Sequence, residues 1–142
     1  MKFKFSLEPV LKVREHKEKL QKQKLAEKQR QKQIISDKKD QVAAELEQFL
    51  GEKDKSAVYD TRKLRNAYAH LEQSHQLMGR LARDMDKADK AVSTERNKLV
   101  KAHRDTHIME KVKDREHSIF KKQLEQLERK QMDEVASLFF NR

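Results

Sequence analysis

A chain of 142 residues is long enough for one domain, but with 41% charged, 35% hydrophobic and 6% aromatic residues and a net charge of +10 it is too polar to enclose an ordinary globular core. It has no cysteine and no stretch near the roughly 20 apolar residues that cross a bilayer, which excludes disulfide frameworks, thiolate sites and transmembrane helices. Only two Gly and one Pro interrupt good helix formers, so long helices that bury a stripe against each other or a partner are expected.

The first predicted helix spans about residues 7–50. Ser6 can cap its free backbone N–H groups, and Pro9 is tolerated in its first turn. One heptad frame gives a seam that is only half apolar, made of Leu7, Leu11, Arg14, Glu18, Gln21, Leu25, Lys28, Lys32, Ile35, Lys39, Val42, Leu46 and Phe49. We therefore predict a weak coiled-coil strand that is most apolar near its end. Residues 1–33 hold most of the excess positive charge, which could attract an acidic protein surface, nucleic acid or anionic lipid.

A hairpin turn is predicted at about residues 51–57. Gly51 can end the first helix in a left-handed conformation, and Asp54, Ser56 or Asp60 can cap the second helix. With a turn centred near residue 55, residue 8 should pair with about residues 100–105. About 40 residues of the second helix, about 60 Å at 1.5 Å per residue, would then project without a partner.

The second predicted helix spans about residues 58–139 and has a more regular repeat. Its a positions are apolar, with Leu64, Leu71, Met78, Met85, Val92 and Leu99. The frame assigns the d positions to Tyr68, His75, Ala82, Asp89, Arg96 and His103. Gly79 is expected to be tolerated inside the helix, and the frame is expected to shift after Leu99, where a bend or a partner is predicted. The apolar end at Leu138, Phe139 and Phe140 indicates an interaction site.

Enzymatic and ligand sites are not indicated. The chain has no glycine-rich loop that could hold ATP phosphates, and a regular rod offers no concave pocket for catalysis. His103 and His107 have the spacing of metal ligands on one helical face, with Asp105 and Glu110 nearby, but a third ligand is undefined. We therefore predict a non-enzymatic protein without cofactor or metal. The basic N-terminus lacks the apolar region of a secretory signal, which favours a cytoplasmic location.

Several short motifs resemble those of the FliJ family. The opening resembles the start of these proteins, with Phe3-Lys4-Phe5-Ser6-Leu7-Glu8-Pro9-Val10-Leu11-Lys12-Val13-Arg14-Glu15. The C-terminal third is similar again, with Ala102-His103-Arg104-Asp105, then Met109-Glu110-Lys111-Val112-Lys113-Asp114-Arg115, then Met132-Asp133-Glu134-Val135-Ala136. Val112 departs from the Leu that the family commonly has there. The motifs occur in order along the whole chain, whereas the middle is generic heptad sequence.

The resemblance implies a cytoplasmic component of the flagellar type III export apparatus, peripherally associated with the inner membrane at the flagellar base. The expected fold is a single coiled-coil domain, residues 1–142, with two long helices in an antiparallel hairpin similar to the central stalk of rotary ATPases. The implied partners are the flagellar export ATPase and its regulator, the cytoplasmic domain of the export gate membrane protein, and export chaperones. No nucleic acid is expected.

The resemblance also suggests two sets of binding residues. The gate would contact the hairpin end, at Val42, Leu46, Phe49, Leu64, Tyr68, Leu71 and His75, although several of these could equally be seam residues. The ATPase would contact both termini, at Phe3, Phe5, Leu7, Arg14, Met132, Glu134, Leu138 and Phe139. Two alternatives remain open at this point: the stalk protein of a virulence type III secretion system, and a generic coiled-coil scaffold or nucleic-acid-binding protein.

Overall fold

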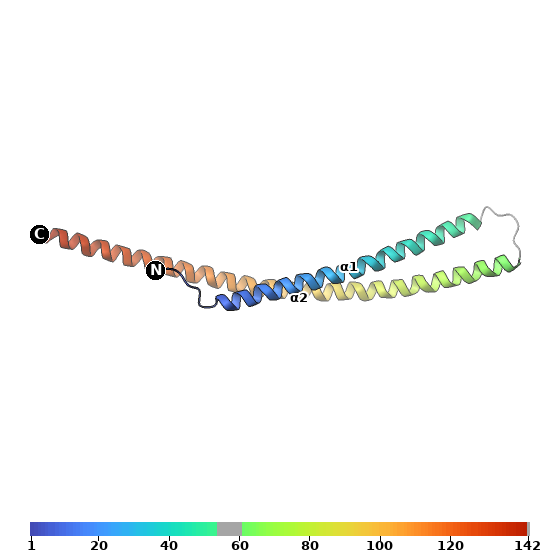
Figure 1. Ribbon diagram of the computed structural model, residues 1–142, viewed down its shortest axis with the longest axis horizontal. Coiled ribbons are helices and arrows are strands. Elements are labelled where there is room, and N and C mark those ends of the chain that lie inside the picture. The colour runs from blue at the N-terminus through green and yellow to red at the C-terminus, as the bar shows by residue number, and fades with distance from the viewer. Residues whose placement is uncertain (54–60, 142) are drawn as a thin grey trace. The chain divides into compact units, whose positions relative to one another are not determined.

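Two long helices make up almost all of the computed structural model, which describes residues 1–53 and 61–141. Helix α1 spans Glu8–Lys53 and helix α2 spans Thr61–Phe140, and the described residues contain no strand (Figure 1). The helices pack against each other in antiparallel directions, as the contacts below show. The expected all-α coiled-coil hairpin is confirmed.

Helix α1 begins one residue later than predicted. The Glu8 N–H donates a hydrogen bond of 3.2 Å to the Phe5 carbonyl, so a backbone turn satisfies this first donor. Pro9 lies in the first turn, where its missing N–H costs nothing. The Glu8 carboxylate also lies at the positive end of the helix dipole, which favours a helix start here.

The prediction that Gly51 ends the first helix is wrong. Helix α1 continues to Lys53, and no described glycine has a positive φ. Glycine permits a left-handed conformation but does not impose it, and Glu52 and Lys53 that follow are good helix formers. The proposed caps Asp54, Ser56 and Asp60 lie outside the described residues. Gly79 lies inside α2, as predicted.

The predicted seam of α1 is confirmed almost residue by residue. Every predicted seam position from Leu11 to Phe49 is buried or half-buried, including the polar ones Arg14, Glu18, Gln21, Lys28, Lys32 and Lys39. Leu7 is the exception, because it precedes the helix and is exposed. The heptad frame therefore identifies the packed face of α1 even where polar side chains occupy it.

The seam of α2 is confirmed in one column and wrong in the other. Leu71, Met78, Met85, Val92 and Leu99 are buried or half-buried, whereas Leu64, the first residue of the predicted a column, is exposed. The predicted d residues Tyr68, His75, Ala82, Asp89, Arg96 and His103 are all exposed. The second packed column lies one residue earlier, at Ala67, Ser74, Leu81, Ala88, Glu95, Ala102, Met109 and Glu116. The expected frame shift after Leu99 is also wrong, because the first column continues in phase through Thr106, Lys113 and Phe120.

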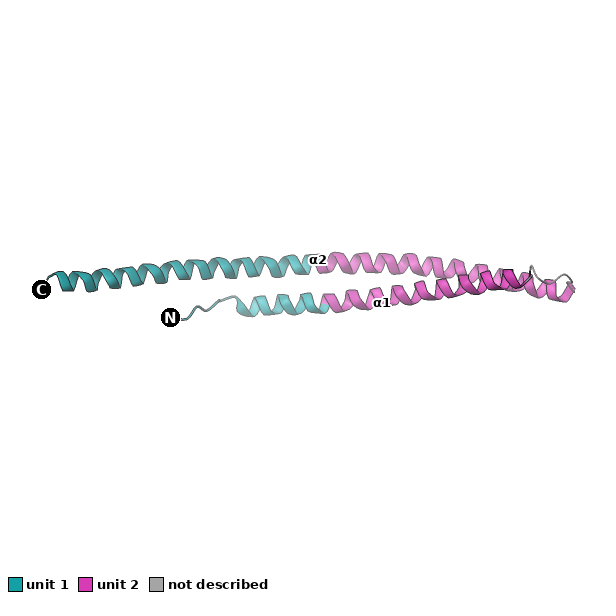
Figure 2. Ribbon diagram, turned by 90° about the horizontal axis from the view of Figure 1, so that it is seen from above, with its two compact units in different colours: residues 1–20, 100–142 teal, residues 21–99 magenta. Residues whose placement is uncertain are grey.

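The chain divides into two compact units, coloured separately in Figure 2. Unit 1 comprises Met1–Leu20 and Val100–Arg142, and unit 2 comprises Gln21–Leu99. The core of unit 1 consists of Phe5, Leu11 and Met109, with Phe3 and Val112 packed against it. Residues 1–7 therefore lie along α2 and cover its apolar positions beyond the start of α1.

The pairing of the helices in unit 1 differs from the expected register. The Lys113 Nζ atom lies 2.9 Å from a Glu8 carboxylate oxygen, whereas residue 8 was expected to face residues 100–105. The expectation assumed a turn centred near residue 55, but α1 runs on to Lys53 and α2 begins only at Thr61, which accounts for part of the difference. The uncovered part of α2 is accordingly shorter than predicted: beyond Phe120 every described residue except Leu124 is exposed.

Candidate functional site

The first candidate surface lies in unit 2 and is called here the hairpin-end surface: Val42, Leu46, Phe49, Leu64, Tyr68, Leu71 and His75. Its seam members are half-buried, and these are Val42, Leu46, Phe49 and Leu71. Tyr68 is 68% exposed and Leu64 is 44% exposed, while His75 is also exposed. The surface thus combines residues that join the two helices with Leu64, Tyr68 and His75, which are available to a partner.

A residue that sequence reasoning missed completes this surface. The His70 ring lies 4.4 Å from the Phe49 ring, between centroids, at an interplanar angle of 60°. His70 also helps to line a shallow groove of about 170 Å³ with Val42, Glu45, Leu46, Gln73, Ser74 and Leu77. The position of His70 could have been inferred only with the correct register between the helices, because neither residue lies near the other in sequence.

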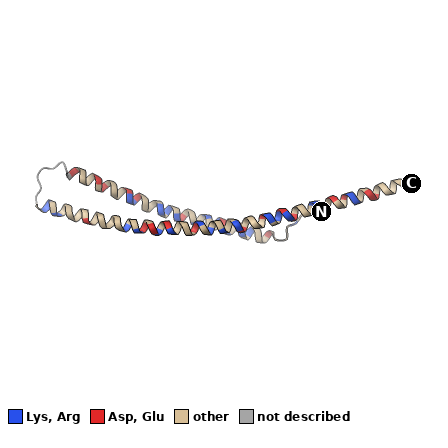
Figure 3. Cartoon of the chain, turned by 180° about the vertical axis from the view of Figure 1, so that it is seen from behind, with Lys and Arg blue, Asp and Glu red and all other residues tan. Residues whose placement is uncertain are grey.

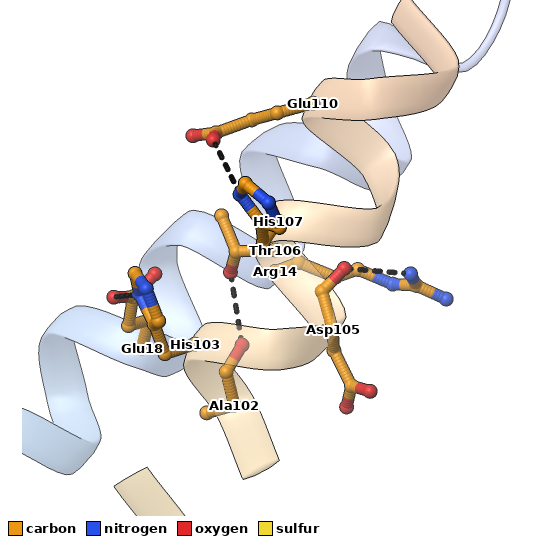
Figure 4. A network of polar contacts seen from close by, with 8 residues as sticks. All are labelled: Arg14, Glu18, Ala102, His103, Asp105, Thr106, His107 and Glu110. Atoms are coloured by element: carbon orange, nitrogen blue, oxygen red, sulfur yellow. Dashed lines mark hydrogen bonds and ion pairs between the residues drawn. The ribbon is translucent and has the colours of Figure 1, made fainter. Parts of the chain in front are cut away.

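A polar network occupies the seam of unit 1 (Figure 4). Glu18 of α1, which is only 8% exposed, lies 2.8 Å from His103 of α2, measured from carboxylate Oε1 to ring Nδ1. One helical turn away, the Arg14 Nη1 atom donates a hydrogen bond of 3.0 Å to the Asp105 carbonyl. A buried carboxylate loses its hydration, so these cross-helix contacts offset part of that cost and fix the pairing of α1 with α2.

The two histidines considered as metal ligands are engaged with carboxylates. His103 contacts Glu18, and the His107 Nδ1 atom lies 3.8 Å from a Glu110 carboxylate oxygen. The two rings stack at 6.4 Å between centroids and 20° between planes. No group of three His, Cys, Asp or Glu residues suited to a metal ion occurs in residues 1–53 and 61–141.

A second polar pair crosses the seam of unit 2. The Gln21 side-chain amide donates hydrogen bonds to the Glu95 carboxylate and, at 3.2 Å, to the Glu95 carbonyl. The amide stabilises the charged carboxylate and lowers the pKa of Glu95 below its ordinary value, with a smaller contribution in the same direction from Lys98. Further along the same unit, Lys32 and Asp89 form an ion pair at 2.6 Å.

The N-terminal candidates for ATPase binding are packed inside unit 1. Phe5 is 8% exposed, and the Phe3 ring packs edge-on against His117 at 4.9 Å and tilted against Phe120 at 5.5 Å, between centroids. Arg14 is half-buried and bonded to α2. Of the four N-terminal candidates, Leu7 is the exposed one, so the other three side chains serve first to hold the chain to α2.

The C-terminal candidates form an exposed surface, called here the C-terminal surface: Met132, Glu134, Leu138 and Phe139. Met132, Leu138 and Phe139 are each at least 70% exposed, and Phe140, which belongs to the predicted apolar end but not to the predicted ATPase set, is 94% exposed. Open grooves of about 480 and 370 Å³ flank this stretch, the first lined by Glu134 and Leu138 and the second by Met132 and Arg129. Large apolar side chains on a helix without an intramolecular partner are typical of a protein-binding surface.

None of the described helices has a stretch apolar enough to span a bilayer.

Comparison with known proteins gives one family. The family described as Flagellar FliJ protein matches residues 3–142, which is nearly the whole chain. Neither the curated protein sequences nor the solved structures contain a significant match.

Proposed function

The chain belongs to the flagellar FliJ protein family and is a component of the flagellar export apparatus, and we propose that it acts there as a non-enzymatic stalk and adaptor. In this role it binds the export ATPase ring and its regulator, promotes ring assembly, contacts the cytoplasmic domain of the export gate and escorts export chaperones. The observation that supports this role most strongly is the change along α2. Its packed face is covered as far as Phe120, whereas the following residues expose large apolar side chains.

The ATPase contact is assigned to the C-terminal surface. Met132, Leu138 and Phe139 are exposed on α2 and not covered by any other described segment, and Glu134 adds a charge beside them. Exposed aromatic and Met side chains are the groups that most often anchor protein interfaces. Leu7 can join them as an exposed residue, whereas Phe3, Phe5 and Arg14 contribute by fixing residues 1–20 against α2.

The gate contact is assigned to the hairpin-end surface. Tyr68 and His75 lie off the packed columns of α2 and are exposed, so a partner can reach them without opening the coiled coil. Leu64 adds an exposed apolar side chain near them. Val42, Leu46, Phe49 and Leu71 lie beneath as seam residues that hold this surface in place.

The location follows from the partners. A protein that contacts the gate and the ATPase works in the cytoplasm, peripherally associated with the inner membrane at the flagellar base. A stalk of a virulence type III system is the second candidate for the architecture, but the match is to a flagellar family.

The test is the ATPase rate and the hexamer fraction of the cognate flagellar export ATPase, with and without this protein, at physiological salt. Stimulation together with a larger hexamer fraction is expected. If the ATPase neither binds the protein nor changes its rate, the stalk role is wrong. A DNA-binding coiled coil would instead retain DNA with a steep dependence on salt and leave the ATPase unaffected.

A further inference from the structure

The helix pair of unit 1 has two flanks, and one cross-helix contact marks each of them. On one flank Glu18 meets His103. On the other flank the Arg14 side chain donates a hydrogen bond to the Asp105 carbonyl. Figure 4 shows these two contacts on opposite sides of the buried Thr106. The exposed side chains beside Arg14 and Asp105 belong to neither of the binding surfaces proposed above.

The register of unit 1 places exposed apolar residues of the two helices at the same level. Two cross-helix contacts lie ten residues apart on each helix: Glu8 with Lys113, and Glu18 with His103. Val13 lies midway between these contacts on α1, and Ile108 lies midway between them on α2. Because both helices rise equally per residue, Val13 and Ile108 are level with each other. Their side chains are 53% and 50% exposed.

Each helix contributes one row of residues to the flank of Arg14 and Asp105. The α1 row recurs at intervals of three and four residues and consists of Val10, Val13, Lys17 and Leu20. The α2 row has the same intervals and consists of Lys101, Asp105, Ile108, Val112, Arg115 and Ile119. Residues at these intervals share one face of a helix. The hydrogen bond from Arg14, a seam residue beside the α1 row, to Asp105 of the α2 row brings the two rows side by side.

The apolar members of these rows are called here the flank surface: Val10, Val13, Leu20, Ile108, Val112 and Ile119. All are exposed except Val112, which is half-buried and packs against the core of unit 1. The corresponding rows of the opposite flank consist of Glu8, Lys12, Glu15 and Lys19 on α1 and of Val100, His103, His107, Glu110, Asp114 and His117 on α2. Exposed apolar side chains are therefore concentrated on one flank of the helix pair.

The charges around the flank surface are almost all positive. Lys17 lies within the α1 row, and Lys101 and Arg115 lie within the α2 row. Arg104 and Lys111 follow on the solvent side of the α2 row. The one acidic member of the two rows is Asp105, which is half-buried beside Arg14. Lys and Arg alternate with Asp and Glu along the chain (Figure 3), so the position within the repeat gives this flank its positive charge.

The cations of this flank are not used to join the two helices. Lys113, a seam residue, pairs with Glu8 at 2.9 Å. By contrast, no carboxylate of the described residues lies within 4.0 Å of the cations bordering the flank surface, which are Lys17, Lys101, Arg104, Lys111 and Arg115. Their charge is available to a partner.

We propose that the flank surface binds an amphipathic α-helix of a partner protein that carries Asp or Glu on both sides of its apolar stripe. The surface extends over 18 residue steps of α2, from Lys101 to Ile119, which is about 27 Å or five helical turns. A helix lying between the two rows buries its apolar stripe against Val13 and Ile108. Its acidic residues then face Lys17 on one side and the cations of α2 on the other.

The same charges disfavour a second copy of this chain as the occupant. Two copies joined through this flank would bring cations against cations, and like charges across an interface oppose association. Duplex nucleic acid is disfavoured by the apolar residues. Val13, Ile108 and their neighbours occupy the middle of the surface, where a nucleic acid would place its charged phosphates.

The experiment titrates the full-length protein into a fluorescently labelled helical peptide at physiological salt and records fluorescence anisotropy. The peptide has Leu at intervals of three and four residues and Glu on both sides of this stripe. A second peptide has Lys in place of every Glu. Because neither peptide contains any part of the ATPase or the gate protein, the result is independent of the proposed stalk function.

The apolar part of the surface is tested with Val13→Gln and Ile108→Gln together. The matched control is Val100→Gln with Leu127→Gln, which changes two exposed apolar residues of unit 1 outside the flank surface. Circular dichroism verifies that both variants remain helical. The test variant should lose at least about tenfold in affinity for the Glu peptide, because less apolar surface is buried, and the control less than about threefold. Equal losses in both variants would overturn the proposal.

The charged part is tested by reversal. The wild-type protein should bind the Glu peptide on the order of tenfold more tightly than the Lys peptide, and Lys17→Glu with Arg115→Glu should reverse this preference. The control, Lys12→Glu with Lys19→Glu, changes the same charge on the opposite flank and should keep the wild-type preference. The proposal is wrong if the wild-type protein does not bind the Glu peptide, or if the reversal leaves the preference unchanged. It is also wrong if sedimentation shows a dimer that Val13→Gln with Ile108→Gln dissociates, because a second copy would then occupy the surface.

Discussion

Glu18 of α1 and His103 of α2 meet across the seam at 2.8 Å, with Glu18 8% exposed and the histidine side chain largely in water. This contact joins a buried acidic position to an exposed basic one. It also fixes which turn of α2 lies beside the start of α1.

Replacing His103 by Ala should therefore destabilise the protein, by about 1 kcal/mol, because a buried carboxylate loses one hydrogen-bond partner. The double replacement Glu18→Leu and His103→Leu should cost less or be stabilising, since it removes the buried charge as well. Urea unfolding followed by circular dichroism measures both effects. His107→Ala is the control, because His107 contacts Glu110 on its own helix. Equal destabilisation by His103→Ala and His107→Ala would contradict the cross-helix role.

The aromatic opening of the chain is predicted to be structural. Phe5→Ala should cost about 3 kcal/mol, because Phe5 is buried against Leu11 and Met109 and its removal leaves a cavity. Leu7→Ala should cost less than about 1 kcal/mol, since Leu7 is already exposed. Hydrogen exchange of the backbone amides in residues 8–20 measures directly how much local stability each variant loses. If protection there is unchanged in Phe5→Ala, residues 1–7 do not hold this part of α1 in place.

The Gln21–Glu95 pair predicts a pH dependence. The hydrogen bond from Gln21 lowers the pKa of Glu95 in the folded state below its ordinary value of 4.5, so the pair stabilises the fold above that pH. The stabilisation is lost as the pH falls through the folded-state pKa. Gln21→Ala should thus lower the melting temperature at neutral pH and have a smaller effect in acid. Gln23→Ala, at an exposed position of α1, is the control. If the effect of Gln21→Ala on the melting temperature stays constant with pH, the hydrogen bond from Gln21 does not link the stability of the fold to the ionisation of Glu95.

The two glycines should both tolerate alanine. Gly51 and Gly79 lie in helices without positive φ, and an added Cβ at either would meet no atom within 4 Å. Alanine should stabilise each site by about 0.5–1 kcal/mol through the entropy of the unfolded chain and the higher helix propensity. Thermal melts of the two variants measure this. Destabilisation by Gly51→Ala would restore the left-handed helix stop that the sequence suggested.

Sequence patterns identified the packed face of α1 better than that of α2, for a physical reason. The α1 frame was anchored by residues such as Leu11, Leu25 and Phe49, and the polar seam positions followed from the period alone. In α2 the second packed column contains Ala67, Ser74, Ala88 and Ala102, whose small side chains carry little hydrophobic signal but let the helices approach closely. Tyr68 and His75, one residue further on, drew the frame to the wrong column.

The candidate site was predictable in part. The exposed apolar end of α2 could be predicted from Leu138 and Phe139, because the predicted length of α1 left no residue of α1 to cover them. Contacts such as Phe49 with His70 and Glu8 with Lys113 could not, because they depend on the register. Register follows from the position of the turn, and the glycine that suggested that position lies inside α1.

The central claim is that the protein uses separate surfaces for the export ATPase and the export gate. The most direct measurement compares two double variants, Leu138→Ala with Phe139→Ala and Tyr68→Ala with His75→Ala, for affinity to the ATPase and to the cytoplasmic domain of the gate protein. All four side chains are exposed, so both variants should fold. The Leu138 and Phe139 variant should lose at least about tenfold in affinity for the ATPase and keep its affinity for the gate protein. The Tyr68 and His75 variant should lose at least about tenfold in affinity for the gate protein and keep its affinity for the ATPase, since exposed aromatic anchors each contribute more than about 1 kcal/mol. Equal effects of both variants on both partners, or no effect on either, would contradict the claim.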